Sequence, residues 1–306
     1  MPLPTSRRLA LLTSASLVLL AGCGGSPDSA GGKSAPARVA VVASTDVYGD
    51  IVARIGGDRA DVTSIISDPG QDPHSYEADT QNQLALSKAK VVVENGGGYD
   101  DFVDRMLKAG HNDSARVINA VKVSGRTAPK GGEVNEHVWY DFPTVARLAD
   151  RMAAALSEAD PSGAAAFREN AAAFKKRLAR LEAEEAQIKK EHGGEGVAIT
   201  EPVPLYMTEA SGLVNRTPAQ FSEAIEEGDD VSPRVLRENL ALFSGRKVKA
   251  LVYNEQTSGP QTEKAEAAAK AAGIPVVPVS ETLPKGEDYL SWMSANLDAL
   301  AGALAG

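Results

Sequence analysis

The chain has 306 residues, of which 43% are hydrophobic and only 5% aromatic, and its formal net charge at pH 7 is −9. This length exceeds what one hydrophobic core usually supports, so we expect two domains of roughly 100 to 150 residues, with cores of Val, Ile, Leu and Ala that suit an α/β protein. The acidic charge and the lack of a basic patch exclude nucleic acid as a partner.

The N-terminus is predicted to be an export signal. Two arginines precede an apolar run, residues 9–20, that is too short for a good transmembrane span. The run ends in Leu20-Ala21-Gly22-Cys23, which resembles the lipobox of bacterial lipoproteins and implies cleavage before Cys23 and attachment of a lipid to its sulfur. We therefore predict a signal peptide over 1–22 and a lipidated flexible tether, rich in Gly, Ser, Ala and Pro, over 23–36.

A first α/β lobe is predicted over residues 37–159. Short runs of β-branched residues alternate with helical segments of about ten residues, and this alternation indicates a parallel sheet covered on both faces. The expected strands are 38–43, 62–66, 91–94 and 116–118; the expected helices are 47–55, 79–88, 99–109 and 143–158; and a loop is expected over 124–136.

One long helix is predicted to link this lobe to a second one. It starts at Asp160-Pro161 and runs to about His192, within a linking segment over 160–193, and roughly 30 residues at about 1.5 Å each would span some 45 Å. Residues 194–306 then repeat the alternation, with expected strands at 197–200, 248–252 and 274–279 and expected helices at 205–212, 261–272 and 289–304. The predicted fold is α/β, with two lobes that each hold a parallel sheet flanked by helices, joined by one long α-helix.

Four potential metal ligands follow the predicted strands and loops. His74 follows the second strand, His137 ends the loop, Glu201 directly follows the strand at 197–200, and Glu281 directly follows the last strand. Ligands of open parallel sheets bind beyond the carboxyl ends of the strands, so two facing lobes would bring these four side chains together. Two imidazoles and two carboxylates can hold Zn²⁺, Mn²⁺ or Fe²⁺. With Cys23 as the only cysteine, a thiolate zinc site is excluded.

Other polar residues are expected to be ordinary surface groups. His111 and His192 follow helical segments in polar surroundings, and we interpret both as solvated side chains. The stretch from Glu226 to Asp230, Glu-Glu-Gly-Asp-Asp, is interpreted as a solvated acidic loop.

Four motifs stand out together in this sequence. They are the lipobox, Asp72-Pro73-His74-Ser75-Tyr76-Glu77, Glu136-His137-Val138-Trp139-Tyr140-Asp141 and the long helix that Asp160-Pro161 begins. Their combination resembles a known family, the metal-binding solute receptors of bacterial ABC transporters for zinc and manganese. The resemblance covers the chain from about Arg38 to its end, and it implies that the family's four ligands fall on His74, His137, Glu201 and Glu281.

The chain departs from the family's pattern in ways that bear on the metal. The usual Asp-Pro before the second histidine is Asn135-Glu136 here, and the loop before His137 has no run of histidines. Glu201 stands where many zinc receptors have histidine and manganese receptors often have Glu, while Glu281 stands where Asp is more common. Glu201 and the missing run of histidines favour manganese, although such a site binds zinc more tightly by the Irving–Williams order. The choice between the two metals stays open.

The resemblance implies a receptor rather than an enzyme. We expect it to capture one divalent transition metal between two lobes and to deliver it to an ABC permease; the candidates are Mn²⁺ and Zn²⁺, with Fe²⁺ third. It would be a monomer, exported by the Sec or the twin-arginine route and anchored by its lipid to the outer face of the cytoplasmic membrane. Two alternatives remain. One is a metal-dependent hydrolase of the cell envelope, which would need an open coordination position. The other is a receptor for a siderophore or corrinoid, which would need a large pocket lined by arginine or aromatic side chains.

Overall fold

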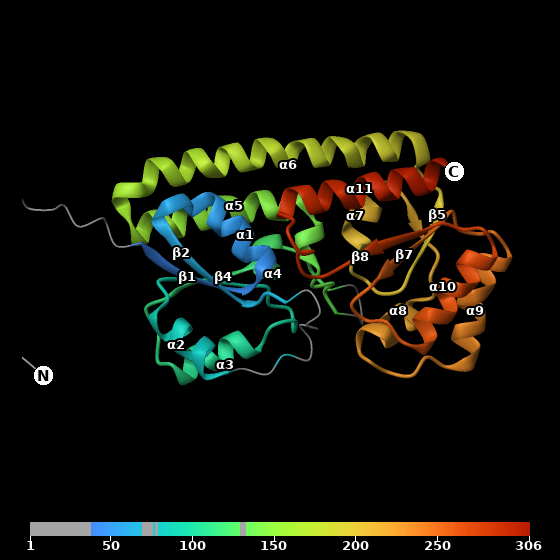
Figure 1. Cartoon of the computed structure of the whole chain (residues 1–306), viewed down its shortest axis with the longest axis horizontal. Helices are drawn as coiled ribbons and strands as arrows, with labels where there is room; N and C mark the ends of the chain where they lie inside the picture. Colours follow the sequence, from blue (N-terminus) through green and yellow to red (C-terminus); the bar gives the residue numbers. More distant parts are fainter. Residues whose placement is uncertain (1–37, 69–75, 77–78, 129–132) are drawn as a thin grey trace, which may run out of the picture. The chain divides into compact units, whose positions relative to one another are not determined.

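The computed structural model describes residues 38–306 except 69–75, 77–78 and 129–132. Its N-terminal half contains a four-stranded parallel sheet in the order β2-β1-β3-β4 (Figure 1). The strands are β1 (Val39–Thr45), β2 (Ala60–Ile66), β3 (Val91–Glu94) and β4 (Arg116–Asn119). Val41 and Ala43 of β1 face one apolar cluster and Val42 faces another, so both faces of the sheet are buried, as parallel sheets require.

Helices cover both faces of this sheet. On one face lie α1 (Asp46–Gly56), α4 (Ala120–Ser124) and α5 (Phe142–Ala159), and on the other lie α2 (Thr80–Lys88) and α3 (Phe102–Ala109). The Asp79 side chain accepts a hydrogen bond from the Asn82 backbone N–H at 2.8 Å and so caps α2, as a short polar residue at this position does. We call this sheet with its helices the N-terminal lobe.

The C-terminal lobe is built in the same way. Its parallel sheet has the order β6-β5-β7-β8, with β5 (Gly196–Ile199), β6 (Val214–Asn215), β7 (Ala250–Asn254) and β8 (Val276–Val279). The helices are α7 (Leu205–Ala210), α8 (Ala219–Glu226), α9 (Pro233–Ser244), α10 (Pro260–Ala271) and α11 (Tyr289–Ala305). Apolar side chains of α8, α9 and α10 pack on one face of the sheet, and those of α7 and α11 pack on the other.

The long helix α6 (Ala164–His192) joins the lobes and lies along both of them (Figure 1). It packs against α1 and α5 in its first part and against α7 and α11 further on. Its buried apolar residues belong to one cluster that contains residues of β1 as well as of β8, so the hydrophobic core continues through both lobes. Among the residues that the structure describes, no helix has the length and apolar character needed to cross a bilayer.

The predicted fold class is confirmed, with several differences in detail. The long helix begins at Ala164, because Pro161–Gly163 form a 3₁₀ turn in which the Asp160 side chain accepts from the Ser162 backbone N–H at 3.1 Å. Helix α3 begins at Phe102 rather than at residue 99. The elements α4, β6, α8 and α9 were not predicted. The first three have eight residues or fewer and owe their order to packing: Phe221 of α8 is fully buried against the sheet. Helix α9 has 12 residues and one buried apolar face, so its pattern was present in the sequence and was overlooked.

Candidate functional site

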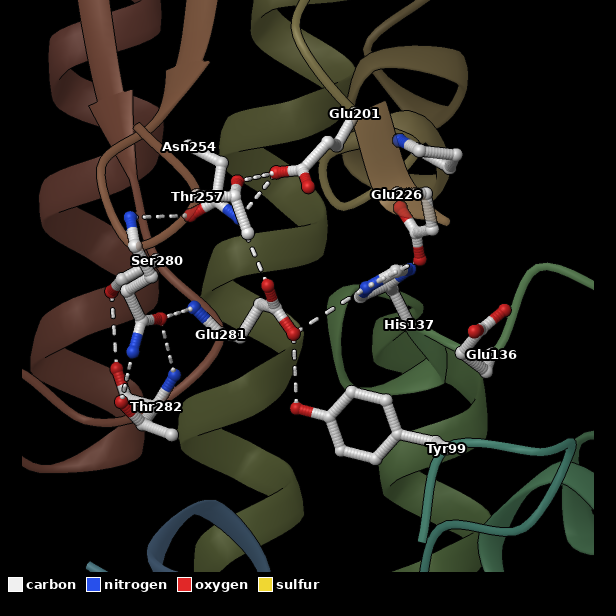
Figure 2. A network of polar contacts seen from close by, with 12 residues as sticks. Tyr99, Glu136, His137, Glu201, Glu226, Asn254, Thr257, Ser280, Glu281 and Thr282 are labelled. Atoms are coloured by element: carbon white, nitrogen blue, oxygen red, sulfur yellow. Dashed lines mark hydrogen bonds and ion pairs between the residues drawn. The ribbon is translucent and has the colours of Figure 1, made fainter. Parts of the chain in front are cut away.

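Two buried carboxylates lie at the carboxyl edge of the C-terminal sheet. Glu201 comes two residues after β5, Glu281 comes two residues after β8, and each is only 2% exposed. Asn254 ends β7, the strand between these two, and its Nδ2 donates to Glu201 Oε2 at 2.5 Å and to Glu281 Oε1 at 2.9 Å (Figure 2). One amide group therefore holds together two carboxylates whose charges repel each other.

The segment Asn254–Thr257 fixes both acids from one side. The Thr257 hydroxyl donates to Glu201 Oε2. The Gln256 side-chain oxygen accepts from the backbone N–H groups of Glu281 and of Thr282, the latter at 3.2 Å, and its Nε2 donates to the Thr282 hydroxyl at 2.8 Å. The loop after β7 thus sets the backbone at Glu281 as well as the carboxylate of Glu201.

The environment of these acids favours a positive charge between them. Burial raises the pKa of Glu201 to about 7, and the charges of Glu281 and Glu226 act in the same direction, while hydrogen bonds from Thr257 and Asn254 oppose the shift. A divalent cation bound to these oxygens would neutralise the repulsion and displace the proton.

His137 comes from the N-terminal lobe and is fully buried. The oxygen Asn135 Oδ1 accepts from the His137 backbone N–H at 3.1 Å and lies 2.8 Å from His137 Nδ1. Since an amide oxygen only accepts, Nδ1 carries a proton, and Nε2 faces the carboxylates. Nε2 lies 3.9 Å from Glu281 Oε2, and histidines that bind metals are commonly oriented in this way through their other nitrogen. Asn135, which departs from the family's Asp-Pro, thus supports His137 directly.

The charges around His137 outweigh its burial. Burial alone lowers the pKa of this imidazole, but the carboxylates of Glu226 and Glu281, with a smaller contribution from Glu136, raise it to about 9. A pocket that stabilises a positive charge at Nε2 also stabilises a metal cation bound there.

Tyr99 adds a further contact between the lobes. Its hydroxyl donates to Glu281 Oε2 at 3.2 Å (Figure 2). Tyr99 follows Gly96, Gly97 and Gly98, whose φ values of 77°, 74° and 100° lie in the region that favours glycine. The Asp100 carboxylate accepts from the Asn95 and Gly96 backbone N–H groups at 2.6 and 2.7 Å and holds this turn in place.

The structure brings three of the four predicted ligands together. His137, Glu201 and Glu281 converge from segments far apart in the sequence, while His74 and the predicted lipidation site Cys23 lie outside the described residues. One imidazole and two carboxylates offer the nitrogen and oxygen donors that zinc, manganese and iron accept.

A fourth side chain at this place was missed. Glu226, interpreted from the sequence as part of a solvated loop, ends α8 with a side chain that is only 13% exposed, and its Oε1 lies 3.5 Å from His137 Nε2. That interpretation is wrong for Glu226, although Asp229 and Asp230 are exposed as expected. The buried Phe221 five residues earlier was the available signal, since it indicates a helix that turns one face inward.

The chain matches the family model described as zinc-uptake complex component A, periplasmic, over residues 41–303. The chain belongs to this family. Among curated relatives, it is 36% identical to the manganese-binding lipoprotein MntA of Bacillus subtilis over 168 residues, which are 53% of each chain. It is 25% identical to the manganese ABC transporter substrate-binding lipoprotein scaA of Streptococcus gordonii over 97% of this chain and 98% of that protein. A crystal structure of ZnuA has 25% identity and a TM-score of 0.72, covering 88% of this chain and 98% of that one.

Membership in the zinc-uptake component A family confirms the predicted class of function. The chain is a substrate-binding component of metal transport and not an enzyme, since the family and these relatives are named as transport components. Neither the family nor these relatives support the alternatives of a metal-dependent hydrolase and of a siderophore or corrinoid receptor.

Proposed function

We propose that this protein captures one divalent transition metal between its two lobes and delivers it to an ABC permease. The ligands are His74, His137, Glu201 and Glu281. The observation that carries the proposal is the convergence of His137 Nε2 with two carboxylates that share the Asn254 amide. A donor set gathered from both lobes suits capture. The long helix α6 packs along both lobes and limits their movement, so release depends on local loop motion rather than on wide opening.

Manganese is the proposed physiological cargo, with zinc as the alternative. Carboxylate oxygens suit Mn²⁺, and the carboxylates of Glu226 and Glu281 lie 3.5 and 3.9 Å from His137 Nε2. The two curated relatives reported above are named for manganese, and the family description is named for zinc. Zinc would bind more tightly to the same donors in the absence of geometric control, so supply and coordination geometry must decide the cargo.

Elemental analysis of gently purified protein, paired with competitive titration of Mn²⁺ against Zn²⁺, tests this proposal. We expect one metal equivalent per chain and loss of tight binding in His74→Ala and in His137→Ala. The matched control is His111→Ala, which removes an exposed histidine and should bind as the wild type does. Unchanged titrations in His74→Ala would contradict the ligand assignment, and a wild-type protein that binds neither metal would contradict the function.

We also propose that the protein is a monomer anchored outside the cytoplasmic membrane by a lipid on Cys23, after removal of residues 1–22 and ahead of the tether 23–36. The lipobox motif supports this, and the relatives MntA and scaA are themselves named lipoproteins. Cys23→Ser should release the protein from the membrane fraction without altering metal binding. Membrane retention of Cys23→Ser would exclude the lipid anchor, and size-exclusion chromatography tests the monomer.

A further inference from the structure

Glu226 approaches the predicted metal ligands more closely than its place in the sequence suggests. Its Oε1 is 3.5 Å from His137 Nε2, compared with 3.9 Å from that nitrogen to Glu281 Oε2. Figure 2 shows the Glu226 carboxylate directed at the imidazole ring. One ligand atom from each of Glu136, His137 and Glu226 lies within 4.8 Å of the others, a spacing that one cation can bridge. The nitrogen that would bind the metal therefore faces Glu226.

Glu226 also belongs to the wall of a neighbouring pocket. This pocket has a volume of about 260 Å³ and lies between the segment after α8 and the loop after β7. Asp229 and Asp230 line it, and so do Glu226 and Thr257, two residues that contact the proposed ligands. A cation in the pocket would thus meet the Glu226 carboxylate on its way to His137, and acidic walls concentrate cations.

We propose that Glu226 is a further ligand of the transported cation. Its carboxylate receives the cation from the pocket and stays bound to Mn²⁺ as an additional oxygen donor. This inference rests on the proposed function. Zn²⁺ is satisfied by four ligands, whereas manganese takes a larger, oxygen-rich shell. Glu226 would therefore determine specificity by favouring Mn²⁺ at a site whose other donors favour Zn²⁺.

A purely structural role for Glu226 predicts the opposite sign. If this carboxylate served only as the counter-ion of a protonated His137, it would compete with the metal for the imidazole. Its removal would then strengthen metal binding, since metal ligands must lose their protons. Removal of a true ligand weakens binding, and it weakens Mn²⁺ binding more than Zn²⁺ binding, whereas loss of a nearby negative charge alone would weaken both equally.

The test compares Glu226→Gln with Glu227→Gln, a matched control that removes the same charge from the adjacent, exposed residue. Both are titrated with MnCl₂ and ZnCl₂ against competing chelators. We expect the Kd of Glu226→Gln for Mn²⁺ to rise by about tenfold or more, and its Kd for Zn²⁺ to rise by less than about threefold. The Kd values of Glu227→Gln for both metals should stay within about twofold of the wild type. The EPR spectrum of bound Mn²⁺ should also change in Glu226→Gln alone.

The outcomes separate this inference from the proposed function. Equal or tighter Mn²⁺ binding by Glu226→Gln, with a wild type that binds metal, overturns the role of Glu226 and leaves the function intact. A wild type that binds neither metal overturns the function itself. Melting temperatures without metal check folding, and Glu226→Asp, which keeps the charge on a side chain shorter by one methylene, should give an intermediate Mn²⁺ affinity. Wild-type Mn²⁺ affinity in Glu226→Asp together with a misfolded Glu226→Gln would also overturn the inference.

Discussion

Replacing Asn254 with leucine should weaken metal binding although Asn254 is not proposed as a ligand. The two side chains branch at the same atom, so the substitution removes the amide, and the larger leucine is matched by the same substitution in the control below. The amide now donates to Glu201 at 2.5 Å and to Glu281 at 2.9 Å. Without it, the two carboxylates repel each other with no shared donor, and the metal must draw them together again.

The expected loss follows from those two contacts. A hydrogen bond to a charged group contributes about 1.5–3 kcal/mol to stability, but the part that appears in metal affinity is smaller, because the carboxylates relax in the metal-free protein. Loss of a residue that orients metal ligands typically lowers affinity by about 10- to 100-fold. This range corresponds to about 1.4–2.8 kcal/mol of binding free energy.

Chelator competition with Mn²⁺ and Zn²⁺ measures the effect in Asn254→Leu. The matched control is Asn239→Leu, at a fully buried position in α9 whose side-chain amide atoms have no hydrogen-bond partner in the described part of the chain. The control should bind both metals as the wild type does. A Kd for Asn254→Leu within about twofold of the control would refute the reasoning, since it would mean that the carboxylates need no shared donor.

Three further predictions concern stability. Burial, together with the charges of nearby acids, raises the pKa of Glu185 on α6 from 4.5 to about 8. The ionised carboxylate therefore destabilises the folded protein. This destabilisation is absent below pH 4.5, grows as the pH rises and is complete above pH 8. Glu185→Gln should therefore raise the free energy of unfolding at pH 8.5 by about 1–3 kcal/mol and have little effect at pH 4.5, as measured by urea denaturation. Gly96→Ala should lower that energy by about 1–3 kcal/mol, because φ is 77° and a Cβ would lie 2.1 Å from Asn119 Nδ2. Tyr289→Phe should cost about 1 kcal/mol, because the buried hydroxyl donates to the Trp139 carbonyl at 2.6 Å.

Matched variants isolate the cause in the first two cases. Glu169→Gln changes an exposed acid of the same helix and should show no pH-dependent gain; a parallel gain in both variants would contradict the role of burial. Gly125→Ala introduces a side chain at a φ of 64° with no atom within 4 Å of its Cβ, so it measures backbone strain alone. If Gly96→Ala lowers the free energy of unfolding no more than Gly125→Ala does, the contact with Asn119 is excluded as a cause of the loss. For Tyr289→Phe, an unchanged denaturation midpoint would show that water replaces the lost donor.

Much of the fold follows from local patterns. The β-branched runs before Thr45 and Glu94 are typical of strands buried on both faces, and helical spacing over about 30 residues predicts a long α6 whatever its neighbours are. Position 137 was recognisable because a histidine between Glu136 and Trp139 stands at the end of a loop. Such signals lie within a few residues of one another and do not depend on the order of the strands.

The sequence by itself therefore determined two parallel-sheet lobes, a connecting helix and acids at two strand ends. Only the tertiary structure decided which side chains meet, because the contacts depend on strand order and on packing between distant segments. β7 lies between β5 and β8, which lets Asn254 reach both Glu201 and Glu281. The burial of α8 against the C-terminal sheet brings Glu226 to His137 of the other lobe, a contact across 89 positions of sequence that no local pattern encodes.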